Sequence, residues 1–340
     1  MKIEVYSPTI RRKEMDAVLT AMVEDRIGPG EHTQFLVSTA KEHLGFDFCL
    51  ALRSPAVALE LALEALGAEK GRGVIVSALS PLYYERVIRT MGLVPLYCDT
   101  SMDLPLMSQA KIQAFMSSNP LCMIYHETLG YVGETDYAAE LGIPVIVDAS
   151  QSFGSALGEK KAGCSGTFGI LGLEERDMIT SGGGALLYAR TRRDGSLLRD
   201  LGELPPEYSL PDMNAAMAAV QFRESGKNLE KRREIAAVYR NASLQTRHRH
   251  FTQKEEFEYN NYVFSLVIET GAKDVKAYAR RKEIIVEEAF DATLSGSGVI
   301  PAAQCPGASS LALRTLLFPL YPRLASSHAE KVAKLVMTLP

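Results

Sequence analysis

Short apolar runs alternate with amphipathic stretches up to about residue 190 of the chain. Continuous apolar runs of this length are typical of parallel strands covered on both faces, and the stretches between them predict helices. Because parallel strands need long connections, we expect right-handed β-α-β crossovers and an α/β fold. The runs that predict strands are 74–76, 94–97, 121–124, 145–147 and 185–188, and the helical stretches are 13–23, 31–44 and 56–66.

The pattern changes after Thr191. One long helical stretch over 213–240 is followed by shorter elements that alternate again, which indicates a second, smaller α/β unit. We therefore predict a large domain over 1–235 and a small C-terminal domain over 236–340. The small domain is expected to contain strands at 262–267 and 284–287 and helices at 274–281 and 327–337.

The composition is typical of a soluble globular chain. Of the 340 residues, 46% are hydrophobic and 23% are charged, and the mean hydropathy is −0.02. No apolar run is long enough to cross a bilayer as a helix, and the first residues lack the pattern of a signal peptide. The 37 basic and 41 acidic residues argue against a non-specific nucleic-acid binder. We expect a cytoplasmic protein with neither a membrane nor a nucleic-acid partner.

The cysteines and histidines do not suggest a metal site. The five cysteines are scattered, with no pair two to four residues apart, so they predict neither a disulfide framework nor a zinc site. The one close histidine pair, His248 and His250, lies in a polar stretch without further ligands at metal-site spacing. We therefore expect no metal, and a reducing compartment.

The segment with the most chemical information is 145–154. It places Asp148 at the carboxyl end of a buried strand, where open α/β sheets bind their ligands, and Gln151 follows on the turn. Two interpretations of these residues remain open. In one they hold a ligand, and in the other they serve only as turn and cap groups.

Several segments, taken in order, resemble the DegT family of sugar aminotransferases, which are pyridoxal-phosphate proteins of fold type I. The segments that carry the resemblance are 27–29, 56–66, 145–154, 166–169, 180–185, 212–216, 231–237 and 313–322. The resemblance implies a large domain with a mostly parallel sheet covered by helices, plus a smaller C-terminal α/β domain. It also implies a homodimer, and amination of keto-sugars on nucleotide carriers with glutamate as the amino donor.

Two cofactor positions of that family are kept in this chain. Asp148 matches the aspartate that pairs with the protonated pyridine nitrogen, where a carboxylate keeps the ring cationic and able to accept electrons. Gln151 matches the glutamine that packs near the ring. The aromatic residue that stacks on the ring corresponds to Pro81, and Tyr83 or Tyr84 replaces it only with a shift in register.

The Schiff-base lysine of the family is absent. Its expected position lies near Glu174, and no lysine occurs between Lys161 and Lys227. A related branch uses histidine there, but no histidine occurs between His126 and His248. Without a primary amine, no covalent link to the cofactor forms and the usual proton carrier is missing. We therefore name no catalytic residue.

The phosphate site of the family has changed as well. The chain has Ser54, Pro55 and Ala56 at the start of the predicted buried helix, where the family has Ser-Gly-Thr. Ser54 is a good N-cap and Pro55 a good first helical residue, but Pro55 has no N–H and Ala56 has no hydroxyl. The candidate cofactor residues Asp148, Gln151, Ser54 and Ala56 are thus vestigial or serve a cofactor held without a covalent bond.

Three hypotheses about function follow. The first is a degenerate family member without a cofactor, which acts as a binding, regulatory or partner protein in surface-polysaccharide or amino-sugar metabolism and takes a sugar nucleotide as ligand. The second is an enzyme on a nucleotide keto-sugar, which either holds pyridoxal or pyridoxamine phosphate without a covalent bond or runs a different reaction with Glu174 or Glu175 as acid/base. The third is a subunit that lends loops to a catalytic homologue, motivated by the unusual segment 204–211.

Overall fold

The computed structural model describes residues 2–340, apart from the side chain of Ala139. The α-helices are α1 (Arg12–Val23), α2 (Glu31–Leu44), α3 (Pro55–Ala65), α4 (Leu82–Thr90), α5 (Gln109–Gln113), α6 (Asp136–Glu140), α7 (Arg192–Arg199), α8 (Asp212–Ser243), α9 (Ala272–Arg281), α10 (Pro306–Arg314) and α11 (Ser326–Met337). The strands are β1 (Phe48–Leu52), β2 (Gly73–Ser77), β3 (Val94–Cys98), β4 (Cys122–His126), β5 (Val145–Asp148), β6 (Ala156–Leu157), β7 (Lys160–Lys161), β8 (Phe168–Gly172), β9 (Ala185–Ala189), β10 (Phe257–Glu258), β11 (Phe264–Val267), β12 (Glu287–Glu288) and β13 (Thr315–Phe318). Within residues 2–340, no helix combines the length and apolar character that a membrane span requires.

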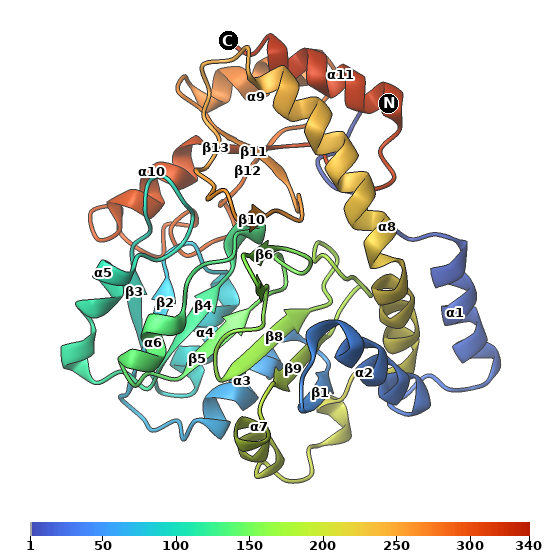
Figure 1. The fold of residues 1–340 in the computed structure, drawn as a ribbon, viewed down its shortest axis with the longest axis vertical. Helices are drawn as coiled ribbons and strands as arrows, with labels where there is room; N and C mark the ends of the chain where they lie inside the picture. The colour runs from blue at the N-terminus through green and yellow to red at the C-terminus, as the bar shows by residue number, and fades with distance from the viewer. Residues whose placement is uncertain (1) are drawn as a thin grey trace.

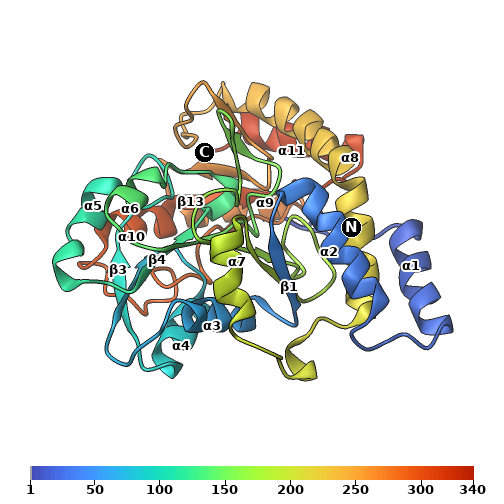
Figure 2. The same cartoon turned by 60° about the horizontal axis from the view of Figure 1, so that its bottom comes forward.

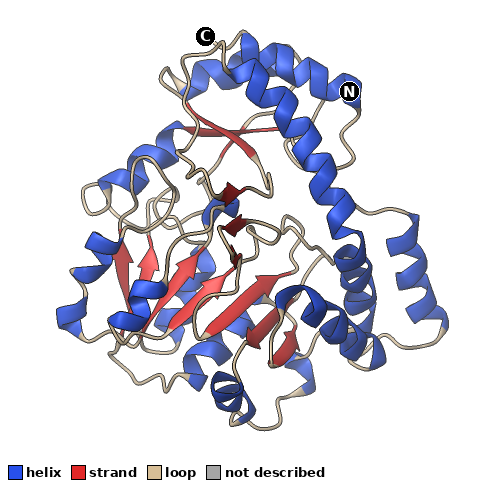
Figure 3. Ribbon diagram, viewed as in Figure 1, coloured by secondary structure: helices blue, strands red, loops and turns tan. Residues whose placement is uncertain are grey.

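A seven-stranded sheet forms the centre of the large domain (Figure 3), in the order β1-β9-β8-β5-β4-β2-β3. The adjacent strands β3, β2, β4 and β5 pair in parallel, as the apolar runs predicted, and β8, which no predicted run covers, pairs in parallel with β5. The prediction of a parallel strand at 185–188 was wrong, because β9 pairs antiparallel with both β8 and β1. The connection 173–184 contains no helix, so the chain turns back beside β8 instead of crossing over the sheet.

Helices cover both faces of this sheet (Figure 1). On one face, Leu59 and Leu63 of α3 and Ile88 of α4 belong to the largest apolar core, as the nearly all-apolar stretch 56–66 predicted. On the other face, α2 and the first half of α8 pack on β8 and β9. The sheet is therefore the middle of three layers, so ligands can reach it at its carboxyl edge.

The small domain has a core of its own. It contains the antiparallel sheet β11-β13-β12 together with α9, α11 and the second half of α8. Figures 1 and 2 show α8 running unbroken from the large domain to the small one, through the expected boundary at 235. The sequence pattern missed α10 and β13, and it did not indicate that Ile3 packs in this second core.

Two helices begin at carboxylates that lie far away in the sequence. The N-cap position of α2 is Gly30, and Asp212 accepts hydrogen bonds from the backbone N–H of Gly30 at 2.8 Å, His32 at 3.1 Å and Thr33 at 2.8 Å. Likewise, Asp99 accepts from two N–H groups of the first turn of α10. Each carboxylate accepts hydrogen bonds from backbone N–H groups that a helix N-terminus leaves unpaired. Its negative charge also interacts favourably with the positive end of the helix dipole.

Candidate functional site

Asp148 ends β5 and is buried, at 1% exposure. Its Oδ1 accepts from the backbone N–H of Ser150 at 2.9 Å and from the Ser150 hydroxyl. Its Oδ2 accepts from the Tyr83 hydroxyl at 3.3 Å and from the Tyr84 hydroxyl. Both oxygens of this carboxylate are therefore occupied by donors of the protein itself.

The surroundings of Asp148 keep it ionised. Burial by itself would raise the pKa of Asp148, but the neighbouring His126 ring and the hydrogen bonds from Ser150 and Tyr84 outweigh burial and lower that pKa to about 2. His126 is the register partner of Asp148 on β4, and its Nδ1 lies 3.6 Å from Asp148 Oδ2. That distance is too long for a hydrogen bond but suits an ion pair when the ring is protonated.

The two tyrosines come from the first turn of α4. Pro81 is the N-cap residue of this helix, and the ring centroids of Tyr83 and Tyr84 lie 4.8 Å apart in an edge-to-face arrangement. Both hydroxyls donate hydrogen bonds to Asp148. The residues in contact with the carboxylate are therefore these two tyrosines and not Pro81. The burial of both rings and the charge of Asp148 raise the pKa values of the two phenols well above their usual range, so both stay hydrogen-bond donors.

The residues of the expected lysine position divide into exposed and inward-facing groups. Glu174 and Glu175 are exposed, and Arg176 forms an ion pair with Glu287 at 2.7 Å. Asp177 faces inward, and its Oδ2 accepts from the backbone N–H of Glu174 at 2.8 Å. The acid–base residues expected at Glu174 or Glu175 therefore point to solvent, while the chain places a different carboxyl group inside.

Asp177 packs over the end of β8, next to Ser150. A Cβ at Gly172 would lie 2.3 Å from Asp177 Oδ2 and 2.8 Å from Ser150 Oγ, so only glycine allows this packing. Burial and the charge of Asp148 raise the pKa of Asp177 well above its usual range. The site thus contains Asp148, whose pKa is lowered, with a second carboxyl group nearby whose pKa is raised. Sequence reasoning gave Gly172 no role.

The side chain of Gln151 holds a loop. Its Oε1 accepts from the backbone N–H of Leu129 at 2.6 Å, and Leu129 has a left-handed backbone with φ of 53°. The backbone carbonyl of Gln151 accepts from the Asn260 amide at 2.8 Å. The amide oxygen expected near a cofactor ring is therefore engaged with the chain that follows β4.

Ser54 is the N-cap of α3, as its position before Pro55 predicted. Its hydroxyl oxygen accepts from the backbone N–H of Val57 at 3.3 Å, and α3 begins at Pro55. Ala56 follows as the second residue of the helix and is half-buried. This helix N-terminus therefore already uses its serine oxygen on its own backbone.

Glu127 is a buried carboxyl group that sequence reasoning missed. It directly follows β4, and its Oε2 accepts from the Ser152 hydroxyl and from the backbone N–H of Gly163 at 3.2 Å. Its Oε1 has no hydrogen-bond partner among residues 2–340. Burial raises the pKa of Glu127 to about 8, despite the opposing hydrogen bonds. Glu127 lies three residues after the apolar run 121–124, and a charged residue close behind a buried strand was the available signal.

Solved structures with the same architecture are aminotransferases. The aminotransferase TlmJ from Streptoalloteichus hindustanus superimposes with a TM-score of 0.89 at 20% identity, over 99% of this chain and 98% of that one. The pyridoxal-phosphate form of the putative sugar aminotransferase Spr1654 from Streptococcus pneumoniae superimposes with a TM-score of 0.90 at 17% identity, over 99% of this chain and 98% of that one. The expected fold-type-I aminotransferase architecture is confirmed.

Comparison of the sequence identifies the family within this architecture. The model of the DegT/DnrJ/EryC1/StrS aminotransferase family matches residues 8–337, and the chain belongs to this family. L-Glutamine:2-deoxy-scyllo-inosose aminotransferase from Streptomyces fradiae is 27% identical over 206 residues, 59% of this chain and about half (48%) of that protein's length. The putative pyridoxal phosphate-dependent aminotransferase EpsN from Bacillus subtilis (strain 168) is 25% identical over 271 residues, 71% of this chain and 68% of that protein.

Proposed function

We propose that this family member does not form the covalent bond to pyridoxal phosphate and acts as a binding or regulatory partner protein in amino-sugar or surface-polysaccharide metabolism. The observation that carries the proposal is the state of Asp148. In the family this carboxylate pairs with the cofactor nitrogen, and here both of its oxygens accept hydrogen bonds from Tyr83, Tyr84 and Ser150. A pyridine nitrogen would have to displace one of these donors.

The other cofactor contacts support the same proposal. No lysine lies between Lys161 and Lys227, and the inward-facing residue of that stretch beside Asp148 is Asp177, which supplies no amine. At the start of α3, Pro55 lacks the N–H that a phosphate would accept. The residues present do not fit a cofactor held by an amine, a free carboxylate and a helix N-terminus.

The metabolic context of the proposal comes from relatives. By its name, the Streptomyces fradiae protein transfers an amino group from L-glutamine to a cyclic ketone, 2-deoxy-scyllo-inosose. We infer that this chain takes a related ligand, a keto-sugar or its nucleotide-linked form. UDP-N-acetylglucosamine carries a nucleotide and a sugar but no sugar ketone, so it probes recognition of the nucleotide-linked form, and saturable heat of binding by titration calorimetry would support this part of the proposal.

A second candidate is an active enzyme that holds pyridoxal or pyridoxamine phosphate without a covalent bond. The specific observation in its favour is that Asp148 is kept and ionised, with its pKa lowered to about 2. A carboxylate in that state suits a cationic ring partner. For this candidate, the Tyr83 or Tyr84 hydroxyl must move away when the cofactor enters.

The deciding experiment is an absorbance titration of the purified protein with pyridoxal phosphate and, separately, with pyridoxamine phosphate. Each sample is then reduced with borohydride, digested and mapped by mass spectrometry. We expect no saturable change in absorbance and no lysine that is modified in preference to the others. Preferential modification of one lysine would contradict the proposal, whereas low labelling spread over surface lysines would not.

Saturable binding without a lysine adduct would favour the second candidate instead. Asp148→Asn then serves as the matched variant, because it keeps the shape of the side chain and removes the charge that a cationic ring requires. Loss of pyridoxamine phosphate binding in a variant with unchanged circular dichroism would establish Asp148 as a cofactor contact. Unchanged binding would place the compound elsewhere.

The proposed assembly is a homodimer. Light scattering of the purified protein tests it directly, and twice the chain mass is the expected result. Co-purification with a lysine-containing homologue in a one-to-one complex would favour the third hypothesis, a subunit that completes the site of a catalytic partner. The homodimer alone, with no homologue captured, would count against that hypothesis.

A further inference from the structure

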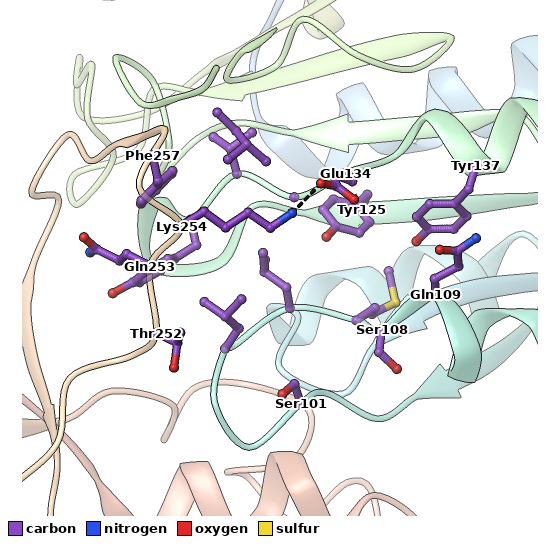
Figure 4. A pocket seen from close by; sticks show the side chains of 17 residues that line it. Ser101, Ser108, Gln109, Tyr125, Glu134, Tyr137, Thr252, Gln253, Lys254 and Phe257 are labelled. Atoms are coloured by element: carbon purple, nitrogen blue, oxygen red, sulfur yellow. Dashed lines mark hydrogen bonds and ion pairs between the residues drawn. The ribbon is translucent and has the colours of Figure 1, made fainter. Parts of the chain in front are cut away.

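A cavity of about 220 Å³ lies beyond the carboxyl ends of β3 and β4, and none of its lining residues belongs to the Asp148 cluster. Its walls come mainly from the segments 101–109, 131–137 and 252–257. Figure 4 shows side chains from these separate parts of the chain facing a common space. The cavity is mostly apolar with a few polar groups, which is the usual character of a small-molecule site.

Tyr125 of β4 brings a hydroxyl to this cavity. The residue is 2% exposed and lines the cavity. A Cβ at position 133 would lie 1.9 Å from the Tyr125 hydroxyl oxygen, so Gly133 leaves the room that this hydroxyl occupies. The cavity is therefore built around this donor.

Tyr137 of α6 supplies a second hydroxyl, and this one is unpaired. Its oxygen is buried and has no hydrogen-bond partner within residues 2–340. Both tyrosines line the cavity, and in Figure 4 both hydroxyls point toward the common space. A buried hydroxyl is normally satisfied, so the unpaired Tyr137 hydroxyl beside this cavity indicates that a bound molecule completes its hydrogen bond, with the Tyr125 hydroxyl as a neighbouring donor.

The remaining walls suit an aromatic ring without net charge. Tyr131 and Phe257 both line the cavity and stack on each other, with ring centroids 5.5 Å apart and planes 13° from parallel. Lys254 extends across the view in Figure 4 and forms an ion pair with Glu134, so the charges at this position cancel. The side chains of Lys254 and Glu134 are 61% and 60% exposed, and an exposed pair of this kind is weak enough to open for a ligand.

We propose that this cavity binds a small neutral aromatic compound that carries a carbonyl oxygen. The ring lies against the apolar walls, and the oxygen accepts hydrogen bonds from Tyr125 and Tyr137. A carbonyl oxygen has two lone pairs and so accommodates both donors. This site is independent of the Asp148 cluster, so the proposal holds or fails separately from the proposed function.

The test uses benzamide as a probe and benzoate as the matched anion of the same size. Saturation-transfer NMR titrations of the full-length protein measure the dissociation constant of each compound. We expect benzamide to saturate in the millimolar range, which is usual for a compound this small, and benzoate to bind about tenfold more weakly. No saturable binding of benzamide, or equal binding of benzoate, would overturn the proposal.

Two variants locate the probe. Tyr125→Phe and Tyr137→Phe each remove one donor and keep the ring, so each should weaken benzamide binding about tenfold. Tyr278→Phe is the matched control, because the Tyr278 hydroxyl bonds Thr338 on the surface of the small domain. Circular dichroism verifies the fold of each variant. Unchanged benzamide affinity in both folded cavity variants would place the probe elsewhere and refute the assigned site.

Discussion

The hydroxyl of Tyr84 donates a hydrogen bond to the carboxylate of Asp148, which lies 64 residues later in the sequence. Tyr84 is fully buried on α4 and Asp148 ends β5, so the bond joins a helix to the central sheet. A hydrogen bond to an ionised group is stronger than one between neutral groups. This contact therefore stabilises the fold as well as occupying the carboxylate.

Tyr84→Phe should lower the free energy of unfolding by roughly 1.5–3 kcal/mol, because it leaves a buried charge with one donor fewer. Tyr83→Phe is the matched variant, since the Tyr83 hydroxyl lies 3.3 Å from the same oxygen and makes the weaker bond. Urea unfolding at neutral pH measures both. An equal effect of the two substitutions would contradict the assigned geometry.

Glu127 should make the stability of the protein depend on pH. Burial raises its pKa to about 8 in the folded state, while the unfolded chain titrates near the ordinary value of 4.5. Between these two pH values the folded state binds more protons than the unfolded state. The contribution of Glu127 to stability is therefore full below pH 4.5, decreases as pH rises to about 8, and changes no further above it.

Glu127→Gln removes this titration and keeps the size of the side chain. The unfolding free energy of the variant, relative to that of the natural protein, should increase as the pH rises from 5 to 8. Each pH unit in this range contributes at most about 1.4 kcal/mol to the increase. Urea unfolding at several pH values measures this difference. Glu64→Gln on the exposed side of α3 is the control, and a flat difference for Glu127→Gln would contradict the prediction.

Asp212 should act as a long-range cap of α2. Asp212→Ala removes every acceptor for the first turn of the helix and should cost roughly 1–2 kcal/mol. Asp212→Asn should cost less, because Oδ1 alone accepts from the N–H of Gly30, the N–H of Thr33 and the Thr33 hydroxyl. Thermal and urea unfolding of the two variants should preserve this order, and a larger loss in the asparagine variant would refute the cap.

The pH dependence of the Asp212 effect has the opposite sign to that of Glu127. Burial by itself would raise the pKa of Asp212, but its hydrogen bonds with Thr33, His32 and Gly30 lower it below the ordinary value of 3.8. Its charged form therefore stabilises the protein above pH 3.8 and loses this effect as pH falls through the lowered pKa. The stability gap between the natural protein and Asp212→Asn should narrow in that acidic range.

Arg232 should be the strongest single stability determinant at the junction of the two domains. It is 4% exposed, and it donates from α8 to the backbone carbonyls of Asn261 at 3.3 Å, Tyr262 at 2.8 Å and Leu320 at 3.3 Å. Arg232→Met leaves three acceptors unpaired, so we expect a loss of about 3 kcal/mol or more.

The neighbouring residue provides the control for Arg232. Arg233 is exposed on the same helix, and Arg233→Met should change the unfolding free energy by less than about 0.5 kcal/mol. Arg232→Lys should give an intermediate loss, because one ammonium group cannot reproduce the planar guanidinium. If Arg232→Met and Arg233→Met unfold at the same urea concentration, the junction does not depend on this side chain.

Local pattern was sufficient for most of the fold. The apolar runs at 74–76, 94–97 and 145–147 form strands of the central sheet, and the stretch 56–66 forms a buried helix. These predictions succeeded because the burial of a strand or helix face depends on side chains two to four residues apart. The antiparallel direction of β9 was missed because the direction of a strand depends on how its connection folds.

At the candidate site, the sequence by itself determined which chemical groups exist. It located Asp148 at the end of a buried strand, placed Ser54 as a helix cap, and showed that no lysine lies between Lys161 and Lys227. None of these conclusions depends on distant parts of the chain, because each follows from a residue and its immediate neighbours.

Only the tertiary structure decided what those groups face. It directed Tyr83 and Tyr84 onto Asp148, turned Asp177 inward while Glu174 stayed exposed, and brought Asp212 to the helix N-cap Gly30, 182 residues earlier. The physical reason is that hydrogen bonds and charge act over a few ångströms in space, and spacing along the sequence does not specify which distant residues come that close.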